Sequence, residues 1–501
     1  MSTPTSDMST PEYEESLLYD TCLVDGEWRG ADDGRTFAVT DPATGEVIAS
    51  VPLMSTAETE TAIRAAEAAF GPWRTRTAKD RAAILSRWAA QLLEHREQLA
   101  RLLTREQGKP LAEARGEIAY AASFLTFYAA EGERVRGEVI PAPAQESRIV
   151  VLRQPIGVVG CITPWNLPAA MVTRKAAPAL AAGCTVVMKP AEQTPLSALA
   201  IAALGRRAGV PPGVLNVITG DAPSIGRTLC DSPAVRLLSF TGSTEVGRLL
   251  AAQCAPTVKK LSLELGGNAP FLVFPDADLD AAVDAAVLSK FRHSGQTCVC
   301  TNRFLVHDDL YPEFTERFAD RVGKLTVGRG DQQGVDVGPL IDQDGLAKAA
   351  AHVADAVAQG AEVLVGGGRH REGGTFFEPT VLRGVTPGMR VMREETFGPV
   401  AAVASFRTER EAVDLANDSR SGLAGYVFTR DLARAWRVTE ALEVGMVGLN
   451  TGFLSVETAP FGGVKESGLG REGSHHGIEE FLELKFWHIG GLSSPDAAAT
   501  S

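Results

Sequence analysis

A regular alternation of short apolar runs and helix-like stretches, beginning near residue 150, constrains the fold more than any other feature of the sequence. Each run is rich in β-branched residues and has the length of a single strand. The runs cover residues 150–159, 184–188, 214–218, 235–240 and 261–265, and helical stretches over 197–208, 222–230 and 244–254 separate the later ones. Strands that alternate with helices form parallel βαβ units, so the sequence predicts a doubly wound parallel sheet.

A second series of the same kind begins at Ala269 and extends to Val447. It contains expected strands at 271–274 and 304–306 and a helix that ends near Phe291. The chain is therefore predicted to be an α/β protein with two doubly wound parallel-sheet domains. Between the early helices and the first sheet, residues 132–152 have the pattern of a hairpin. Together with the C-terminal run 481–489, that hairpin is a candidate for pairing with another subunit.

Three helices are expected ahead of the first sheet. Ser55 and Glu58 form a capping-box pattern that starts the first helix. A single long helix is expected over 79–106, ended by the Gly108-Lys109-Pro110 turn, and a third over 111–130. Residues 1–20 are expected to be a disordered lead-in, because Ser, Thr, Pro and Glu dominate them, and the Ala-rich residues 493–501 a disordered tail.

Composition excludes several classes of partner. The net charge of −13 argues against nucleic acid, because phosphate binding needs a clustered basic surface. The longest apolar stretch, 176–188, is too short to span a bilayer, and the segment up to Glu27 lacks the regions of a signal peptide. The seven cysteines show no zinc spacing. We therefore expect a cytoplasmic protein with reduced thiols and without a membrane or metal partner.

Two segments are candidates for binding a dinucleotide. Residues 468–473 match the G-x-G-x-x-G spacing, but a turn-like segment precedes them where the motif needs a strand. The better candidate is 240–247, which follows an expected strand and opens a helix whose N-terminal N–H groups can hold a pyrophosphate. Glu192, just past the second strand, is placed to bond an adenosine ribose. Plain helix capping and an exposed glutamate explain these two features equally well.

Four short motifs carry chemically useful side chains. Cys298 follows Gly-Gln-Thr between an expected helix and an expected strand, although burial as an inert thiol is the ordinary role of a lone cysteine. Glu264 ends a strand and is followed by two glycines, and Asn166 lies in a Pro-Trp-Asn-Leu-Pro segment at another strand end. The fourth motif, 394–399, contains Glu395. Ligands bind at the carboxyl ends of parallel strands, where these motifs are expected to meet.

Taken together and in this order, the four motifs resemble the aldehyde dehydrogenase superfamily over about residues 23–492. Within it, the chain is most similar to the succinate-semialdehyde dehydrogenases, through residues 162–166, 171–175, 298–300, 450–452 and 460–465. One departure is Leu167, where phenylalanine is usual. The resemblance implies an aldehyde dehydrogenase-like fold with a small β oligomerisation arm, and a homodimer or homotetramer.

The resemblance also implies domain roles and a mechanism. Residues 21–131 and 153–263 would form the NAD(P)-binding domain, 264–466 the catalytic domain, and 132–152 with 467–492 the oligomerisation and bridging segments. Cys298 would be the nucleophile, and Asn166 with the Cys298 N–H would donate to the oxyanion. Glu264 would activate the water that hydrolyses the thioester.

The resemblance implies a complete cofactor site. Glu395 would hold the nicotinamide ribose beside Phe397, Lys189 and Glu192 the adenosine ribose, and Ser243 the pyrophosphate. The remaining cofactor positions are Thr163, Pro164, Trp165, Gly242 and Gly247. NAD is the favoured cofactor, because the Glu192 carboxylate would repel a 2′-phosphate, while Lys189 leaves NADP possible.

For the substrate, the resemblance implies an aldehyde with a distal carboxylate, bound by Arg174, Arg292 and Ser455. Guanidinium groups form bidentate bonds to carboxylates, which favours succinate semialdehyde. Glutarate semialdehyde is a close rival, since one methylene is worth only about 1–3 kcal/mol of discrimination. A broader aldehyde dehydrogenase, a CoA-acylating enzyme, a cysteine hydrolase and a non-catalytic protein of the same fold are the alternatives.

Cys300 lies two residues from Cys298. In an extended segment the two side chains would point the same way, and Cys300 could capture a sulfenic acid formed on Cys298. A small packed residue is the equally weighted alternative.

Overall fold

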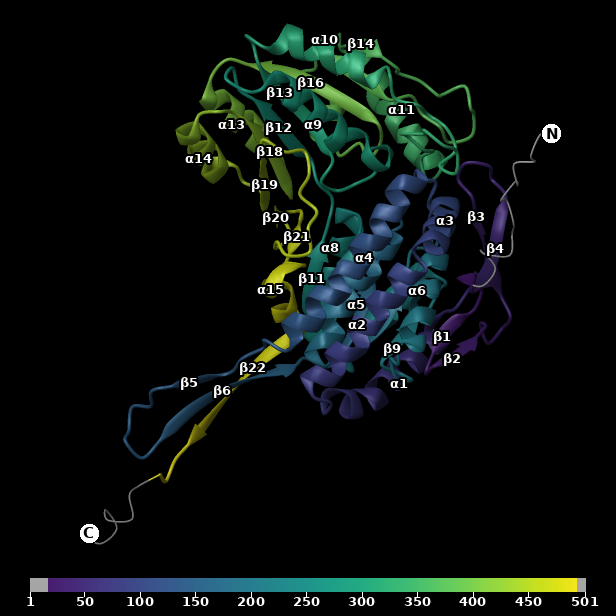
Figure 1. Ribbon diagram of the computed structural model, residues 1–501, viewed down its shortest axis with the longest axis vertical. Helices are drawn as coiled ribbons and strands as arrows, with labels where there is room; N and C mark the ends of the chain where they lie inside the picture. The colour runs from purple at the N-terminus through teal and green to yellow at the C-terminus, as the bar shows by residue number, and fades with distance from the viewer. Residues whose placement is uncertain (1–16, 493–501) are drawn as a thin grey trace, which may run out of the picture.

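The computed structural model describes residues 17–492, which form two α/β domains and a projecting arm (Figure 1). The first domain is built on an eight-stranded sheet with the order β2-β1-β9-β8-β7-β10-β11-β21. Its strands are β1 (Cys22–Val24), β2 (Glu27–Arg29), β7 (Val158–Ile162), β8 (Thr185–Lys189), β9 (Leu215–Val217), β10 (Val235–Thr241), β11 (Lys260–Glu264) and β21 (Gly468–Leu469). Strands β7 to β11 are parallel, as predicted.

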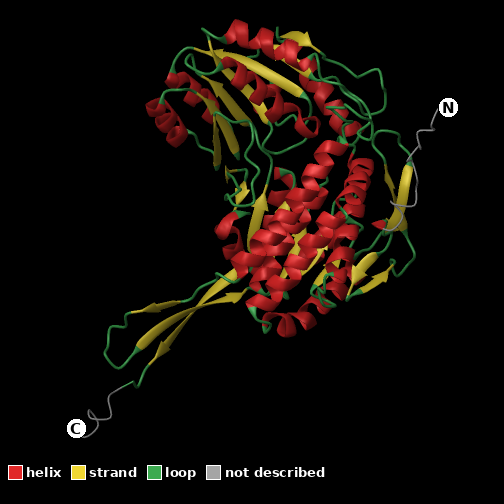
Figure 2. Ribbon diagram, in the orientation of Figure 1, coloured by secondary structure: helices red, strands yellow, loops and turns green. Residues whose placement is uncertain are grey.

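Helices cover this sheet (Figure 2). They are α1 (Thr56–Arg74), α2 (Ala78–Glu94), α3 (Arg96–Gln107), α4 (Leu111–Gly132), α5 (Pro168–Ala182), α6 (Pro195–Arg207), α7 (Ala222–Asp231) and α8 (Thr244–Cys254). The order of the parallel strands reverses between β7 and β10. The loops that follow these two strands therefore diverge at a switch point, which is where open α/β sheets bind ligands.

The second domain repeats the arrangement with a seven-stranded sheet in the order β14-β15-β16-β13-β12-β18-β19. Its strands are β12 (Ala269–Val273), β13 (Thr301–His307), β14 (Glu362–Val365), β15 (Thr380–Arg383), β16 (Val400–Phe406), β18 (Ala424–Phe428) and β19 (Met446–Leu449), of which β14 alone is antiparallel to its neighbour. Its helices are α9 (Leu279–Phe291), α10 (Tyr311–Val322), α11 (Gln343–Ala358), α12 (Arg390–Arg393), α13 (Glu409–Asn417) and α14 (Leu432–Ala441). The predicted α/β fold with two doubly wound parallel sheets is confirmed.

Three smaller units complete the described chain. The hairpin β3 (Thr36–Thr40) and β4 (Val47–Pro52) and the pair β17 (Ser421–Gly422) and β20 (Val464–Lys465) lie beside the domains, and α15 (Ser474–Gly477) leads to the last strand. The arm consists of β5 (Glu138–Ile140), β6 (Arg148–Pro155) and β22 (Leu482–Ile489), with β6 in the middle. The expected hairpin over 132–152 is thus present, and the C-terminal strand pairs with it inside the same chain.

Four expectations need correction. The single helix over 79–106 is two helices, because His95 (φ −100°, ψ 19°) bends the chain and allows Leu92 and Leu99 both to be buried. The run 150–159 is the end of β6 and the start of β7, separated by Gly157 with φ +135°.

The other two concern segment boundaries. Residues 17–20 do not belong to a disordered lead-in: Leu17 is buried and the Tyr19 ring stacks on Trp28 at 4.3 Å. Residues 1–16 and 493–501 lie outside the described residues. The segment 467–481 belongs to the first domain, since β21 pairs with β11 and Phe481 is buried in that core.

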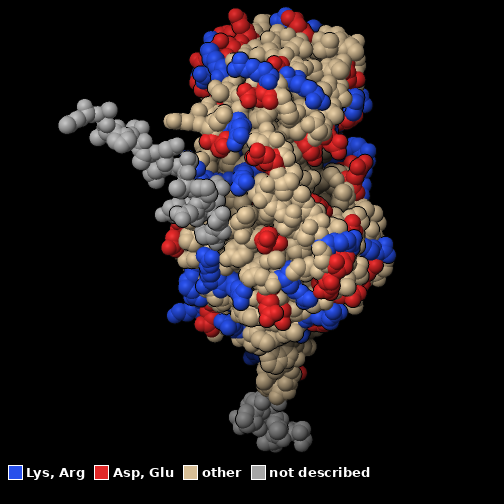
Figure 3. All heavy atoms as spheres, turned by 90° about the vertical axis from the view of Figure 1, so that its right-hand side faces the viewer, with Lys and Arg blue, Asp and Glu red and all other residues tan. Residues whose placement is uncertain are grey.

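Acidic and basic side chains are interspersed on the face shown in Figure 3. Exposed pairs such as Arg227–Asp231, at 2.6 Å, contribute at most about 1 kcal/mol each. The buried ion pairs lie instead around the site described next. Within residues 17–492, no helix is both long and apolar enough to cross a membrane.

Candidate active site

A cavity of about 620 Å³ lies between the two domains, at the carboxyl ends of β7, β10 and β11. The first domain contributes the loops that follow these strands, and the second contributes the loop before β13 and the segment after α12. The predicted site residues that line the cavity are Pro164, Trp165, Asn166, Arg174, Gly242, Ser243, Glu264, Arg292, Cys298, Glu395, Phe397 and Ser455. Residues separated by more than half of the chain therefore meet at the carboxyl ends of the parallel strands, as expected, and this edge of the sheet is its switch point.

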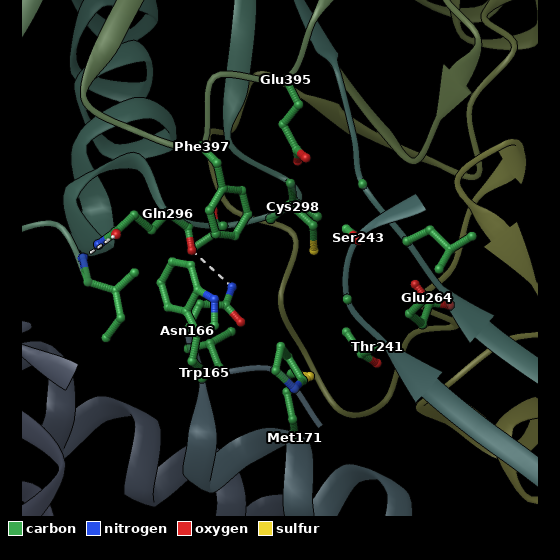
Figure 4. A pocket seen from close by; sticks show the side chains of 18 of the residues that line it. Trp165, Asn166, Met171, Thr241, Ser243, Glu264, Gln296, Cys298, Glu395 and Phe397 are labelled. Carbon is green, nitrogen blue, oxygen red and sulfur yellow. Dashed lines mark hydrogen bonds between the residues drawn. The ribbon is translucent and has the colours of Figure 1, made fainter. Parts of the chain in front are cut away.

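Cys298 lies in a constrained loop between α9 and β13. Its sulfur points into the cavity among Asn166, Met171 and Glu264 (Figure 4). Upstream, His293 and Ser294 adopt left-handed backbone angles, with φ of 52° and 58°. Gly295, at φ +73°, is also required by space, because a Cβ there would lie 2.3 Å from the Gly398 carbonyl oxygen. The loop thus stores conformational strain next to the thiol.

The environment of the thiol disfavours its ionised form. Burial, together with the carboxylates of Glu264 and Glu395, raises the pKa of Cys298 to about 12, although Arg174 opposes the rise. A thiol of this kind is protonated at neutral pH. It needs a neighbouring positive charge or a base before it can act as a nucleophile.

The Asn166 side-chain amide faces the thiol across the cavity. It donates to the Gln296 carbonyl oxygen at 2.9 Å, and the Gln296 side-chain oxygen accepts from the Ile341 N–H at 3.0 Å. The amide from the first domain is therefore tied directly to the loop that carries Cys298. Its position suits a donor to an oxygen on the carbon that the thiol attacks.

Glu264 ends β11, and the two glycines that come after it, Gly266 and Gly267, leave space for neighbouring loops. A Cβ on Gly266 would lie 2.8 Å from a Glu395 carboxylate oxygen, and one on Gly267 would lie 2.2 Å from the Cys298 carbonyl oxygen. The glycines thus let both second-domain loops approach Glu264. Both of its carboxylate oxygens are buried and have no hydrogen-bond partner among the described residues.

Burial and the nearby Glu472 carboxylate raise the pKa of Glu264 well above its ordinary value, although Arg174 and Lys175 oppose the rise. An unpartnered buried carboxyl group is costly to a fold. Such groups with strongly raised pKa values are typical of acid–base sites.

Sequence reasoning missed Glu472. It accepts from Lys175 Nζ at 2.6 Å, and Arg174 Nε lies 2.8 Å away in an ion pair that lacks the angle of a directed hydrogen bond. Burial would raise the pKa of Glu472, but Lys175 and Arg174 hold it below its ordinary value. Glu472 belongs to the segment with G-x-G-x-x-G spacing. That segment is no dinucleotide motif, as predicted, because its first residues form β21, antiparallel to β11.

Arg174, Arg292 and Ser455 all line the cavity, although they come from α5, the start of the loop that carries Cys298 and the segment after β19. The Arg174 guanidinium lies over the Phe461 ring at 3.8 Å, and that of Arg292 over the Phe453 ring at 4.8 Å. Stacking on aromatic faces orients both groups. The arrangement is therefore suited to an anionic group at a distance from Cys298.

The expected nicotinamide side of the cavity contains Glu395, Phe397 and Trp165. Glu395 accepts from the Gly267 N–H at 3.0 Å, and burial raises its pKa to about 7. Phe397, with φ +54°, packs edge-to-face against Trp165 at 5.4 Å. On the opposite side, the Ser243 hydroxyl accepts from the Val246 N–H at 3.3 Å, so it caps α8 while the helix N-terminus faces the cavity.

Four expected cofactor residues, Thr163, Lys189, Glu192 and Gly247, are not among the described residues that line the cavity. Lys189 and Glu192 instead form an ion pair of 2.6 Å at the end of β8, with the Glu192 side chain 40% exposed. The Thr163 N–H donates to the Lys189 carbonyl oxygen at 3.1 Å. Gly247 packs α8 on the sheet, since a Cβ there would lie 2.4 Å from Leu265.

The backbone between Cys298 and Cys300 does not have the conformation that was expected. The segment 297–300 is a turn closed by the Cys300 N–H donating to the Thr297 carbonyl oxygen at 3.0 Å, so the expectation of an extended segment was wrong. The Cys300 thiol donates to the Lys290 carbonyl oxygen at 3.1 Å, and Cys300 is not among the residues that line the cavity. The geometry therefore gives the two sulfurs different surroundings.

Tyr120 and Lys348 also line the cavity and were not found from the sequence, because neither belongs to a recognisable motif. Among the described residues, no cluster of histidine, cysteine and carboxylate side chains could hold a metal ion. The first sheet is of the type that binds dinucleotides, and it faces a cysteine across the cavity. This combination is typical of the dinucleotide-dependent oxidoreductases.

Comparison with known proteins identifies the family. Residues 28–487 match the aldehyde dehydrogenase family. The chain is 56% identical to a glutarate-semialdehyde dehydrogenase of Pseudomonas aeruginosa over 96% of this chain and 99% of that protein. It is 55% identical to a succinate-semialdehyde dehydrogenase of Escherichia coli whose name specifies NADP(+), over 95% and 99%. The crystal structure of succinate-semialdehyde dehydrogenase from Burkholderia pseudomallei superposes with a TM-score of 0.95 at 58% identity, covering 97% of this chain and 100% of that one.

The chain belongs to the aldehyde dehydrogenase family. It is an oxidoreductase that oxidises aldehydes with NAD or NADP, and the predicted resemblance is confirmed.

Proposed function

We propose that the chain oxidises succinate semialdehyde to succinate, with NAD favoured over NADP. The observation that carries the proposal is the convergence of Arg174, Arg292 and Ser455 on the cavity that holds Cys298. A buried carboxylate requires cationic or hydrogen-bonding partners, and two guanidinium groups with a hydroxyl supply them. A simple alkyl aldehyde would offer no anion to either guanidinium group, although Arg174 is also paired with Glu472.

In the proposed reaction, Cys298 gives its proton to a solvent water molecule, and its thiolate attacks the aldehyde carbon. The Asn166 amide then turns from the Gln296 carbonyl to the developing oxyanion, and the Cys298 N–H is the second donor. One such donor is worth about 100- to 1000-fold in rate. Collapse of the oxyanion with loss of a hydride leaves a thioester on Cys298.

Glu264 acts in the second half of the reaction. Its unpartnered oxygens accept a proton from water as the water attacks the thioester, and the Cys298 thiolate leaves. The raised pKa of the carboxyl group makes it a stronger base than an exposed glutamate. Water rather than coenzyme A is then the acceptor, so acid forms with no coenzyme A present.

The residues around the cavity fit a dinucleotide. The buried hydroxyl of Thr241 has no partner within residues 17–492, the N-terminus of α8 opens on the cavity, and Glu395 offers a carboxylate to a ribose. A bound nicotinamide would supply the acceptor for the hydride. Lys189 and Glu192 would hold the adenosine ribose. Pro164, Trp165 and Gly242 would form walls of the cofactor site, and Thr163 and Gly247 would support it from outside the cavity.

Glutarate semialdehyde is the second candidate, because a relative of that name is as similar as one named for succinate semialdehyde. The substrates differ by one methylene, worth about 1–3 kcal/mol of binding. NADP is likewise the second cofactor, on the name of the Escherichia coli relative.

The test measures kcat/KM for succinate semialdehyde, glutarate semialdehyde and butanal with each cofactor. Arg292→Ala is the informative variant, because Arg174 also pairs with Glu472 and its loss affects stability. We expect a fall of about 100-fold for succinate semialdehyde and little change for butanal, as for loss of a charged hydrogen bond. Arg434→Ala is the matched control, since its guanidinium also lies over a phenylalanine, Phe274, but far from the cavity. Equal losses on both aldehydes in Arg292→Ala would refute carboxylate recognition.

The proposal that the protein is a homodimer or homotetramer rests on the exposed apolar side chains of the arm. Leu484, Phe486 and Trp487 on β22 are 66%, 70% and 57% exposed. Apolar surface of this kind marks an interface, so we propose that a second copy of the chain covers it. Phe486→Asp should shift the molar mass in light scattering to that of the monomer, whereas Leu432→Asp, at a residue equally exposed on α14, should not. An unchanged mass in Phe486→Asp would refute the arm as the interface.

A further inference from the structure

Lys109 and Glu117 form a buried ion pair next to the cavity, in none of the motifs assigned above. Their side chains are 0% and 1% exposed. Lys109 follows Gly108 in the turn between α3 and α4, and Glu117 lies on α4. Burying two charges costs several kcal/mol per ion unless they are well paired and hydrogen-bonded. The other hydrogen bonds of the two side chains therefore indicate which part of the structure this costly pair stabilises.

Within residues 17–492, the other hydrogen bonds of the two side chains go to the short stretch from Asn166 to Ala170. Lys109 Nζ donates to the main-chain carbonyl oxygen of Asn166 at 2.7 Å. Glu117 Oε1 accepts from the N–H groups of Ala169 and Ala170 at 2.9 and 3.2 Å. The pair thus ties Asn166, near the end of the segment between β7 and α5, to the first turn of α5, and that segment carries the Asn166 amide.

The backbone around Lys109 makes a second set of contacts, with the catalytic domain. A Cβ on Gly330 would lie 2.2 Å from the Lys109 carbonyl oxygen, and one on Gly338 would lie 2.2 Å from that of Gly108. The Gly338 carbonyl oxygen accepts from the Ser294 hydroxyl at 2.9 Å, inside the nucleophile loop. The Lys109 turn is therefore packed between the segment that holds Asn166 and the segment that holds the Cys298 loop.

We propose that Lys109, paired with Glu117, is a positioning residue that fixes the Asn166 amide relative to Cys298. The inference rests on the proposed role of Asn166 as an oxyanion donor. Lys109 touches neither substrate nor sulfur; it acts through the Asn166 backbone. Without the bond from Nζ, the Asn166 carbonyl loses a charged partner and the loop is free to shift. Displacing a catalytic group by about 1 Å can cost about 100-fold in rate.

A double-mutant cycle tests the proposal on the full-length protein. Lys109→Met keeps the volume, and Glu117 retains two N–H donors at the N-terminus of α5, where a negative charge is favourable. The measured quantity is the rate of the NADH burst with succinate semialdehyde. We expect a loss of about 10- to 100-fold in Lys109→Met. In the Asn166→Ala background the same change should alter the burst by less than about twofold, because the group that it positions is gone.

Lys259→Met is the matched control. Lys259 is also buried, and its Nζ also donates to main-chain carbonyls, those of Ser232 and Val235, but it lies away from the cavity. It should lower the melting temperature without lowering the burst. Glu117→Gln is a milder second variant, since the amide oxygen still accepts from α5. Its smaller loss should also vanish in the Asn166→Ala background.

Additive losses from Lys109→Met and Asn166→Ala would overturn the positioning role and leave a structural ion pair. A burst in Lys109→Met equal to that of the wild type would overturn it too. A different result, an unchanged burst in Asn166→Ala alone, would instead remove Asn166 from the proposed mechanism. The failure of the further inference and that of the proposed function are thus distinguishable.

Discussion

The two walls of the cavity are stabilised in different ways. The first-domain wall contains buried charges held in pairs, with Glu472 between Arg174 and Lys175 and with Lys109 on Glu117. The second-domain wall is held by its backbone, with His293 and Ser294 in left-handed conformations. Forming the first wall requires the desolvation of buried charges, and forming the second requires strained backbone conformations. Each wall should therefore respond to a different kind of change.

The difference follows from the function that we propose for each wall. The first wall must present fixed polar groups to charge that develops during the reaction, which requires preorganised electrostatics. The second wall must place a sulfur atom and the cofactor carboxylate Glu395 at the ends of tight loops, which requires unusual backbone angles. Electrostatic changes should disturb the first wall, and changes of backbone freedom the second.

The largest effect is expected for Cys298→Ala, which removes the proposed nucleophile from the second wall. Aldehyde oxidation should fall by more than about 1000-fold, as for loss of a nucleophile elsewhere. Binding of NAD, measured by calorimetry, should be retained because no other cavity contact changes. Turnover close to that of the wild type would show that the nucleophile is misassigned.

The next effect tests the backbone of the second wall. Gly295→Ala should lower turnover by about 10- to 100-fold, because its Cβ would collide with the Gly398 carbonyl oxygen and displace the Cys298 loop. Gly334→Ala is the control, with a similar φ of +79° but open space around its Cβ, so it should cost only about 1–2 kcal/mol of stability. If both variants kept full activity, the conformational account of this wall would be wrong.

A third prediction concerns charge in the first wall and its dependence on pH. The pKa of Glu264 is raised in the folded state, so the ionised form destabilises the fold, and the stability of the wild type falls as pH rises above about 4.3, the ordinary value. Glu264→Gln should therefore gain about 1–3 kcal/mol over the wild type at pH 9 and little at pH 4.

Glu472→Gln provides the contrast, because the pKa of Glu472 is lowered in the folded state. Its ionised form contributes stability that is present above the ordinary pKa, and the variant should lose it at pH 9. Thermal melts of the wild type and both variants at pH 4 and pH 9 measure these shifts. A Glu264→Gln variant less stable than the wild type at pH 9 would contradict the account.

The smallest expected effect lies outside the cavity, at the ion pair of Lys189 and Glu192. Glu192→Ser should raise the NADP/NAD ratio of kcat/KM by about tenfold, since it removes one partly exposed negative charge and frees Lys189. Glu67→Ser, an exposed glutamate on α1, is the control. The same ratio in both variants would place Glu192 outside the ribose site.

Local sequence signals were sufficient for the parts of the site that lie at strand ends. Alternating strands and helices predicted the parallel sheets, and the switch point then brought Asn166, Glu264 and Cys298 together. The Gly-Gly pair after Glu264 was visible as a motif. Its reason, space for Glu395 and for the Cys298 carbonyl, required the three-dimensional arrangement.

Long-range pairing was beyond sequence reasoning. Lys175 and Glu472 are 297 residues apart, and nothing in the local pattern of either indicates a buried partner. The bend at His95 was missed because the apolar pattern continues through it. The turn at 297–300 was missed because the spacing of two residues between the cysteines does not indicate a backbone conformation. Such features depend on tertiary contacts that no short window of sequence contains.

The central claim is that a thioester forms on Cys298 and that Glu264 is needed for its hydrolysis. The most direct measurement mixes Glu264→Gln with succinate semialdehyde and NAD, follows NADH absorbance, and determines the mass of the intact protein and its peptides. The account predicts a burst of one NADH per site, then a stall, with a succinyl group on the peptide that contains Cys298. Steady turnover at the wild-type rate with an unmodified Cys298 peptide would contradict it.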